Sequence, residues 1–169
     1  MSVEGDRALA TDWSAAFDEL VAAHHSDMLR LAYGLVGDRA TAADAVQAAW
    51  TAAWEHRAEL RDASKVRGWL LAITANQARK ALRWRSIRHW LPLAAASEPG
   101  AAPAHHEERL DLVALLQTLP LRDRQILLLR YALRESSADI GRQVGLSESG
   151  VRVRLSRLLA RLREDLGNE

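Results

Sequence analysis

The sequence predicts an all-α protein made of two small helical domains joined by a flexible linker, the second domain being a helix-turn-helix. Apolar residues recur at helical spacing in residues 8–86 and again in residues 109–169. Between them, residues 87–108 contain Pro92, Pro99, Gly100 and Pro103, which break helices. We therefore expect domains over residues 8–86 and 109–169, with a linker over residues 87–108.

Three helices are expected in the first domain. The first covers residues 8–36 and stops at Gly37-Asp38. The second can be capped by Thr41, and its apolar positions include Val46, Trp50 and Trp54. The third begins near Ser64, and its second half is basic.

The second domain begins with a short amphipathic helix over residues 110–119. Pro120 can start the next helix, residues 121–133, whose inward residues are Ile126, Leu127 and Tyr131.

Two further helices form the helix-turn-helix. Ser136 or Ser137 caps the first, Gly145 makes the turn, and Ser147 caps the last helix, which runs to about residue 166.

The length and amino-acid composition exclude several classes of protein. The chain has 169 residues, of which 49% are hydrophobic and 27% charged, as in soluble globular proteins. It has no cysteine, which excludes disulfides and thiolate metal sites. We see no signal peptide and no apolar run of the roughly 18 residues a membrane helix needs, so we expect a cytoplasmic protein without stable membrane insertion.

No catalytic pattern or cofactor motif is visible. Phosphate-binding glycine loops, nucleophile elbows and paired carboxylates are missing from the sequence. The pairs His24-His25 and His105-His106 are adjacent residues, which point about 100° apart on a helix and chelate poorly. We expect no enzymatic activity, no cofactor and no metal.

Charge is distributed unevenly along the chain. Residues 1–54 hold eight acidic and three basic residues, whereas residues 65–90 hold seven basic and no acidic residues. A polyanion is the natural partner of the second segment. Trp69, Trp84 and Trp90 are interleaved with these bases, a composition suited to unstacked single-stranded bases, although Trp50, Trp54 and Trp69 are expected mainly in the core.

The last helix has one packing side and one basic side. Its apolar side carries Val151, Leu155, Leu158 and Leu162, and the remaining arc carries Arg152, Arg154, Arg157 and Arg161. A helix-turn-helix inserts the start of its second helix into the major groove, where arginine pairs with guanine or phosphate. A merely solvated charged face is the alternative interpretation.

The order of these parts resembles the extracytoplasmic-function sigma factors of the sigma-70 family, over most of residues 14–166. Gly37-Asp38-Arg39 and residues 42–47 resemble the segment that docks on the clamp helices of the largest RNA polymerase subunit. The resemblance implies docking through Asp44, Gln47 and Thr51. Ala43, Ala45 and Ala48 depart from the usual acidic and leucine residues, which leaves fewer polar contacts.

Residues 66–70 and 73–76 resemble the segment that melts and binds the −10 promoter element as a single strand. Residues 60–64 correspond to a loop that holds a flipped-out base. The resemblance implies the following −10 contacts: Leu60, Arg61, Asp62, Ser64, Lys65, Arg67, Trp69, Asn76, Lys80 and Arg83.

The C-terminal part resembles the domain that binds the −35 element as duplex, with Ser136-Ser137 and Gly141 as departures from the usual residues. The implied −35 contacts are Ser147, Glu148, Ser149, Arg152, Arg154, Ser156 and Arg157.

The family resemblance also implies partners: core RNA polymerase, bound at the clamp helices and at the flap of the second-largest subunit, promoter DNA, and an anti-sigma factor. In the holoenzyme the linker would thread through the polymerase and the protein would lie at the nucleoid.

Two other functions fit parts of the sequence. A stand-alone helix-turn-helix regulator would bind duplex DNA without polymerase. A decoy that binds polymerase or an anti-sigma factor would not depend on Arg152 and Arg157.

Overall fold

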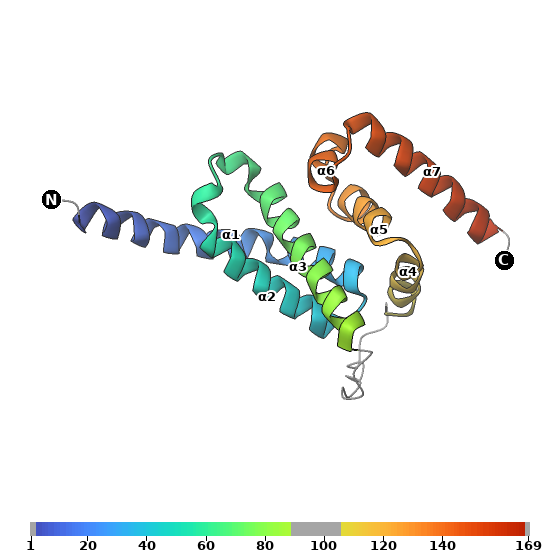
Figure 1. Cartoon of the computed structure of the whole chain (residues 1–169), viewed down its shortest axis with the longest axis horizontal. Helices are drawn as coiled ribbons and strands as arrows, with labels where there is room; N and C mark the ends of the chain where they lie inside the picture. Colours follow the sequence, from blue (N-terminus) through green and yellow to red (C-terminus); the bar gives the residue numbers. More distant parts are fainter. Residues whose placement is uncertain (1–2, 89–105, 168–169) are drawn as a thin grey trace.

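The computed structural model describes the backbone of residues 3–88 and 106–167, and the side chains of residues 16–86 and 112–164 (Figure 1). Within these ranges the regular structure is helical, as the sequence predicts. The N-terminal domain contains α1 (Val3–Val36), α2 (Arg39–Glu55) and α3 (Val66–Arg88), with two short 3-10 helices, η1 (Arg57–Glu59) and η2 (Ala63–Lys65), between α2 and α3.

The core of this domain lies where α1, α2 and α3 pack on one another. Figure 1 shows the N-terminal part of α1 projecting beyond the other two helices. Fully buried residues come from all three helices: Met28, Leu31 and Leu35 from α1, Val46 and Ala49 from α2, and Leu70, Leu71 and Ala78 from α3. Trp50 is also buried, whereas Trp54 is only partly covered and lies edge-on to Phe17.

The break between α1 and α2 is determined by Gly37 and Asp38. Gly37 has a φ of 79°, a left-handed conformation that glycine adopts without strain. The Asp38 carboxylate accepts hydrogen bonds from the backbone N–H groups of Ala40 at 3.2 Å and Thr41 at 3.1 Å. The prediction that Thr41 caps α2 is therefore wrong, because Asp38 satisfies the free N–H groups at the start of the helix.

The C-terminal domain contains α4 (His106–Thr118), α5 (Leu121–Leu127), a π-helix η3 (Leu128–Ala132), α6 (Ser137–Val144) and α7 (Glu148–Gly167). Its buried residues include Ile126, Leu129, Ile140, Val151 and Leu158. Because α3 runs to Arg88 and α4 begins at His106, helices extend into both ends of the predicted linker. Residues 89–105, with Trp90 and the linker prolines, lie outside the described residues.

The helix predicted over residues 121–133 changes type at Leu128. The N–H of Leu133 donates to the carbonyl of Leu128 at 3.1 Å, a spacing of five residues that widens the turn. Arg134 follows with a φ of 58°, which ends the helix. Tyr131 is 57% exposed, so its predicted inward position is wrong: the π-helix changes which side chains face the core.

The two domains pack against each other. α1 contacts α4, α5 and η3, and α3 contacts α6. Gly34 of α1 makes close approach possible, since a Cβ atom there would lie 2.5 Å from a methyl carbon of Leu128.

Candidate nucleic-acid interface

The loop before α3 is organised by Asp62. Its carboxylate accepts from the Ser64 hydroxyl at 2.6 Å and the Ser64 N–H at 3.0 Å, and it pairs with the Lys65 ammonium at 3.0 Å. These hydrogen bonds, with that of the Ser64 side chain foremost, lower the pKa of Asp62 to about 2. Arg61, Ser64 and Lys65 are exposed and Leu60 is half-buried, so this loop presents polar groups to the solvent.

Three of the predicted −10 contacts share one side of α3. Asn76, Lys80 and Arg83 are all exposed and follow one another at four and three residues, the spacing of a single helix face. Trp84, beside Arg83 in the sequence, is 57% exposed. This part of α3 therefore offers an amide, two cations and a nearby aromatic ring.

Arg79 belongs to the same region and is missing from the predicted site. Its guanidinium donates to the side-chain oxygen of Asn76 and, at 2.7 Å, to that of Gln125 in α5. Burial, and then the nearby charge of Arg83, lower the pKa of Arg79. Arg79 is one of the clustered basic residues of α3, so the charge pattern could have identified it as a site residue. Nothing in the sequence indicated that Gln125 would be its partner.

Arg67 and Trp69 do not join this face. Arg67 precedes Asn76 by about two and a half turns, so it projects from the opposite side of α3. Its guanidinium donates to Asp27 of α1 at 2.9 Å and to the carbonyl of Leu133 at 2.7 Å, and it pairs with Glu135. Trp69 is half-buried against the core.

The predicted polymerase-docking residues line one exposed stripe of α2. Asp44, Gln47 and Thr51 are all exposed, and the Thr51 hydroxyl donates to the backbone carbonyl of Gln47 at 3.2 Å. They are three and four residues apart, so one partner surface could contact all three.

The helix-turn-helix is formed by local hydrogen bonds. The Ser136 hydroxyl accepts from the Asp139 N–H at 3.1 Å and caps α6, which selects Ser136 over Ser137. Gly145 has a φ of 67° at the turn. The Ser147 hydroxyl then accepts from the Gly150 N–H at 3.0 Å at the start of α7, as predicted.

Most predicted −35 contacts are exposed at the start of α7. Ser147, Glu148, Ser149, Arg152, Ser156 and Arg157 face the solvent. Arg152 pairs with Glu148 at 2.7 Å, one turn earlier. This surface carries two arginines and four short polar or acidic side chains, a set that can donate to and accept from base edges.

Arg154 differs from the other predicted −35 contacts. Its Nε donates to the carboxylate of Asp123, a buried residue of α5, and this hydrogen bond raises the pKa of Arg154. Arg161 lies 3.7 Å from the same carboxylate. Arg154 therefore anchors α7 to α5, a role the periodicity of α7 alone cannot show.

The pair His24-His25 lies within the described residues, whereas the side chains of His105 and His106 lie outside them. His25 accepts a hydrogen bond from the Trp50 indole at 3.1 Å, and burial lowers the pKa of His24. The described part of the chain brings together no cluster of three or more residues with metal-binding side chains. The helices in the same ranges include none whose length and apolar character would let it span a membrane.

The fold and the exposed basic surfaces define a class of two-domain helical DNA-binding protein with a C-terminal helix-turn-helix. Comparison with known proteins specifies the class further. Residues 20–87 match the family described as Sigma-70 region 2, and residues 109–162 match Sigma-70, region 4.

Two curated relatives illustrate the similarity. A probable RNA polymerase sigma factor, RfaY of Xanthomonas campestris, is 33% identical over 89% of this chain and 40% of its own length. The ECF RNA polymerase sigma factor SigM of Mycobacterium tuberculosis is 30% identical over 90% of this chain and 78% of its own length. The chain thus spans less than half of RfaY but most of SigM. It belongs to the extracytoplasmic-function sigma factors of the sigma-70 family.

A solved structure shares the fold. The sigma factor RpoE of Bartonella quintana, in complex with the anti-sigma factor NepR, superposes with a TM-score of 0.75 at 22% identity, covering 90% of this chain and 97% of RpoE. The expected fold class and the family resemblance are both confirmed.

Proposed function

We propose that this chain, as a sigma factor, binds core RNA polymerase through α2 and recognises promoters with two separate surfaces. α7 would bind the −35 element as duplex, and the loop before α3 with the exposed face of α3 would bind the melted −10 element as a single strand. The observation that carries this proposal is that the exposed residues Asp44, Gln47 and Thr51 lie on α2, whereas the exposed cations lie on two other helices, α3 and α7.

The chemistry of each surface suits its proposed target. α7 begins at a tight turn and exposes arginine, serine and glutamate side chains, which fit the donors and acceptors of the major groove. The face of α3 combines Asn76 with Lys80, Arg83 and the exposed ring of Trp84. Cations can follow a phosphate backbone, and rings stack on unpaired bases.

The further partners are proposed from the family and its relatives. Contacts to the clamp helices of the largest subunit and the flap of the second-largest subunit would place the domains on the polymerase. An anti-sigma factor is a proposed regulator, because RpoE of Bartonella quintana is found in complex with one. We infer that the protein acts in the cytoplasm, at the nucleoid when it is part of the holoenzyme.

Specific initiation is the decisive test. The purified chain would be added to bacterial core RNA polymerase and assayed for transcription from a genomic promoter library, comparing wild type with Asn76→Ala and Arg152→Ala. Arg163→Ala is the matched control, since Arg163 is exposed on α7 far from its first turn. We expect the first two variants to lose or re-target initiation while the control initiates like wild type.

Docking is tested separately with Asp44→Ala, and Asp18→Ala, an exposed acid on α1, serves as the control. We expect only Asp44→Ala to weaken binding to core polymerase. Wild-type chain that binds duplex DNA but not core polymerase would refute the sigma function and favour a stand-alone regulator.

A further inference from the structure

The C-terminal domain engages Arg67, one of the predicted −10 contacts. Within α1 and α3, Arg67 pairs with Asp27; across the domain boundary it donates to the Leu133 carbonyl at 2.7 Å and pairs with Glu135. Glu135 is only 7% exposed. A half-buried guanidinium is thus held by two carboxylates and one carbonyl, a geometry in which charged hydrogen bonds are strong.

The C-terminal domain also engages Arg79 on the other side of α3. Arg79 donates to the buried side chain of Gln125 at 2.7 Å and to the side-chain oxygen of Asn76. The oxygen of Asn76 is therefore occupied by Arg79 while Arg79 is held by α5. The C-terminal domain therefore holds both Arg67, one of the predicted −10 contacts, and Arg79, which bonds to Asn76 on the exposed face of α3.

A third set of contacts covers the end of α1. The last four carbonyls of a helix have no partner within that helix. Gln117 donates to the Gly34 carbonyl at 3.1 Å, and Arg124 donates to the Leu35 carbonyl. Arg124 also donates to the carbonyls of Gln117 at 3.0 Å and Leu119 at 3.1 Å, so the buried guanidinium joins the two domains.

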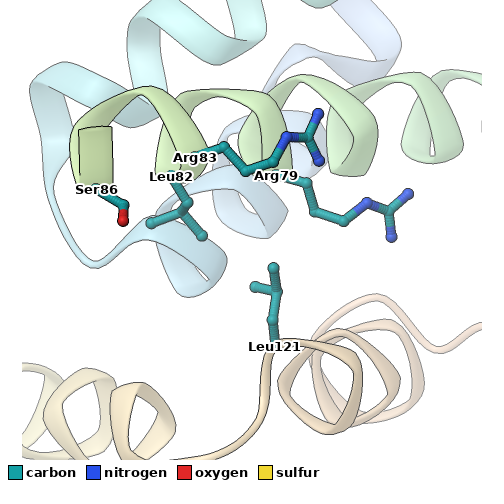
Figure 2. Close-up of a pocket in the computed structure, with 5 residues that line it drawn as sticks. All are labelled: Arg79, Leu82, Arg83, Ser86 and Leu121. Atoms are coloured by element: carbon teal, nitrogen blue, oxygen red, sulfur yellow. The ribbon is translucent and has the colours of Figure 1, made fainter. Parts of the chain in front are cut away.

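The domain boundary is hollow at the end near Ser86. An open pocket of about 420 Å³ is lined by Arg79, Leu82, Arg83, Ser86 and Leu121. Figure 2 shows Leu121 of the C-terminal domain pointing across it toward Leu82 of α3, with the side chains of Arg79 and Arg83 alongside. Near Ser86 the apolar packing between the two domains is therefore incomplete. The domains are joined elsewhere by the polar contacts of Arg67, Arg79, Gln117 and Arg124.

We propose that the free chain is closed by its own C-terminal domain, with Glu135 and Gln125 holding Arg67 and Arg79 away from single-stranded promoter DNA. Promoter DNA and the C-terminal domain then compete for the same cations, and opening frees the −10 surface. The competition with promoter DNA rests on the proposed function. The closed arrangement of the two domains does not depend on that function and can be tested by itself. Since the contact between Arg67 and Glu135 is an ion pair, salt weakens closure.

The closed state can be measured by energy transfer between two dyes. The chain has no cysteine, so cysteines placed at the surface positions Ala58 and Ala160 label one domain each. Glu135→Gln removes the charge that pairs with Arg67 and keeps the shape of the side chain. Glu164→Gln removes the same charge from an exposed position of the same domain and is the control.

We expect Glu135→Gln to change the transfer efficiency toward a longer distance and to raise affinity for a fluorescein-labelled, mixed-sequence single-stranded DNA oligonucleotide about fivefold, as losing a pairwise coupling of ordinary size would. Glu164→Gln is expected to behave as wild type in both measurements. Circular dichroism checks that each variant keeps its helices.

A second pair of variants tests the boundary through side-chain size alone. Gly34→Leu places a side chain where Leu128 lies, whereas Ala23→Leu adds a leucine side chain at an exposed position of α1. Only Gly34→Leu is expected to open the chain and increase binding of the oligonucleotide.

Unchanged transfer efficiency in both Glu135→Gln and Gly34→Leu overturns the closed state. An opened chain that binds the oligonucleotide no better than wild type overturns the competition for Arg67 and Arg79. If no form of the protein binds the oligonucleotide although the transfer efficiencies change as expected, the closed state is supported and the proposed single-strand recognition is refuted.

Discussion

Asp123 is expected to hold α7 in place, and Asp123→Ala measures how strongly. The carboxylate is 3% exposed and bonds to Arg154, with Arg161 at 3.7 Å. A hydrogen bond to a charged group contributes about 1.5–3 kcal/mol. Because the Arg154 side chain is 40% exposed, solvent screens the pair and its own contribution falls to about 1 kcal/mol.

A second loss accompanies the substitution. Asp123 lies in the first turn of α5, where a negative charge stabilises the helix by about 0.3–1 kcal/mol. We therefore expect Asp123→Ala to lower the free energy of unfolding by about 1.3–2 kcal/mol. In a double-mutant cycle with Arg154→Ala, the coupling energy should be about 1 kcal/mol.

Urea unfolding followed by two signals measures this cycle. Five of the six tryptophans lie in the N-terminal domain and the sixth, Trp90, follows it in the sequence, so tryptophan fluorescence mainly reports that domain, whereas circular dichroism reports the helices of both domains. The shift should be larger by circular dichroism than by fluorescence. Arg163→Ala serves as the control for removing a positive charge from α7. A coupling energy within about 0.3 kcal/mol of zero would refute the anchoring role of Asp123.

Four other substitutions test the local structure. Gly68→Ala should raise the free energy of unfolding by about 0.5–1 kcal/mol in urea titrations, because Gly68 lies inside α3 with space beside it. Gly145→Ala should lower it by about 1 kcal/mol or more, because an L side chain is strained at a φ of 67°. Ser136→Ala should lower it by about 1 kcal/mol through loss of the α6 cap, and an unchanged urea midpoint would contradict that role. Burial raises the pKa of Asp38, but hydrogen bonds from Thr41 and Ala40 and the charge of Arg85 outweigh it, so the pKa is lowered. Its contribution is present above the usual pKa of aspartate and is lost as pH falls through the lower folded value, so the difference in Tm between wild type and Asp38→Asn should shrink below about pH 4.

The helical class and the positions of the main turns could be predicted because they depend on neighbouring residues. Gly37 and Gly145 adopt positive φ values where the apolar periodicity stops, and Ser147 caps the helix that comes after it. Even so, local signals compete: Asp38 and Thr41 can both cap a helix, and only the backbone shows that Asp38 does so. The exposure of Asp44, Gln47 and Thr51 also follows from local periodicity.

Long-range contacts could not be predicted from the same pattern. Arg154 occupies the same basic arc as Arg152, but its partner is a carboxylate 31 positions away in the chain. The family resemblance implies that Arg67 contacts DNA, yet its partners in the structure lie 40 and more positions away. Periodicity reports which side of a helix is apolar, and it contains no information about which charge of another helix faces a given arginine.

The π-helix η3 makes the domain boundary depend on the number of residues in one turn. Each residue of an α-helix advances the chain by about 100° around the axis. Deleting one residue from Leu128–Ala132 would restore an ordinary α-helical turn and rotate the residues after it by about that angle. Leu133 and Glu135 would then face away from Arg67. Among relatives of this chain, the length of this turn is accordingly expected to vary together with the charge at the position of Glu135. Insertions and deletions in the turn, more than substitutions, would then decide in which relatives the two domains close on each other.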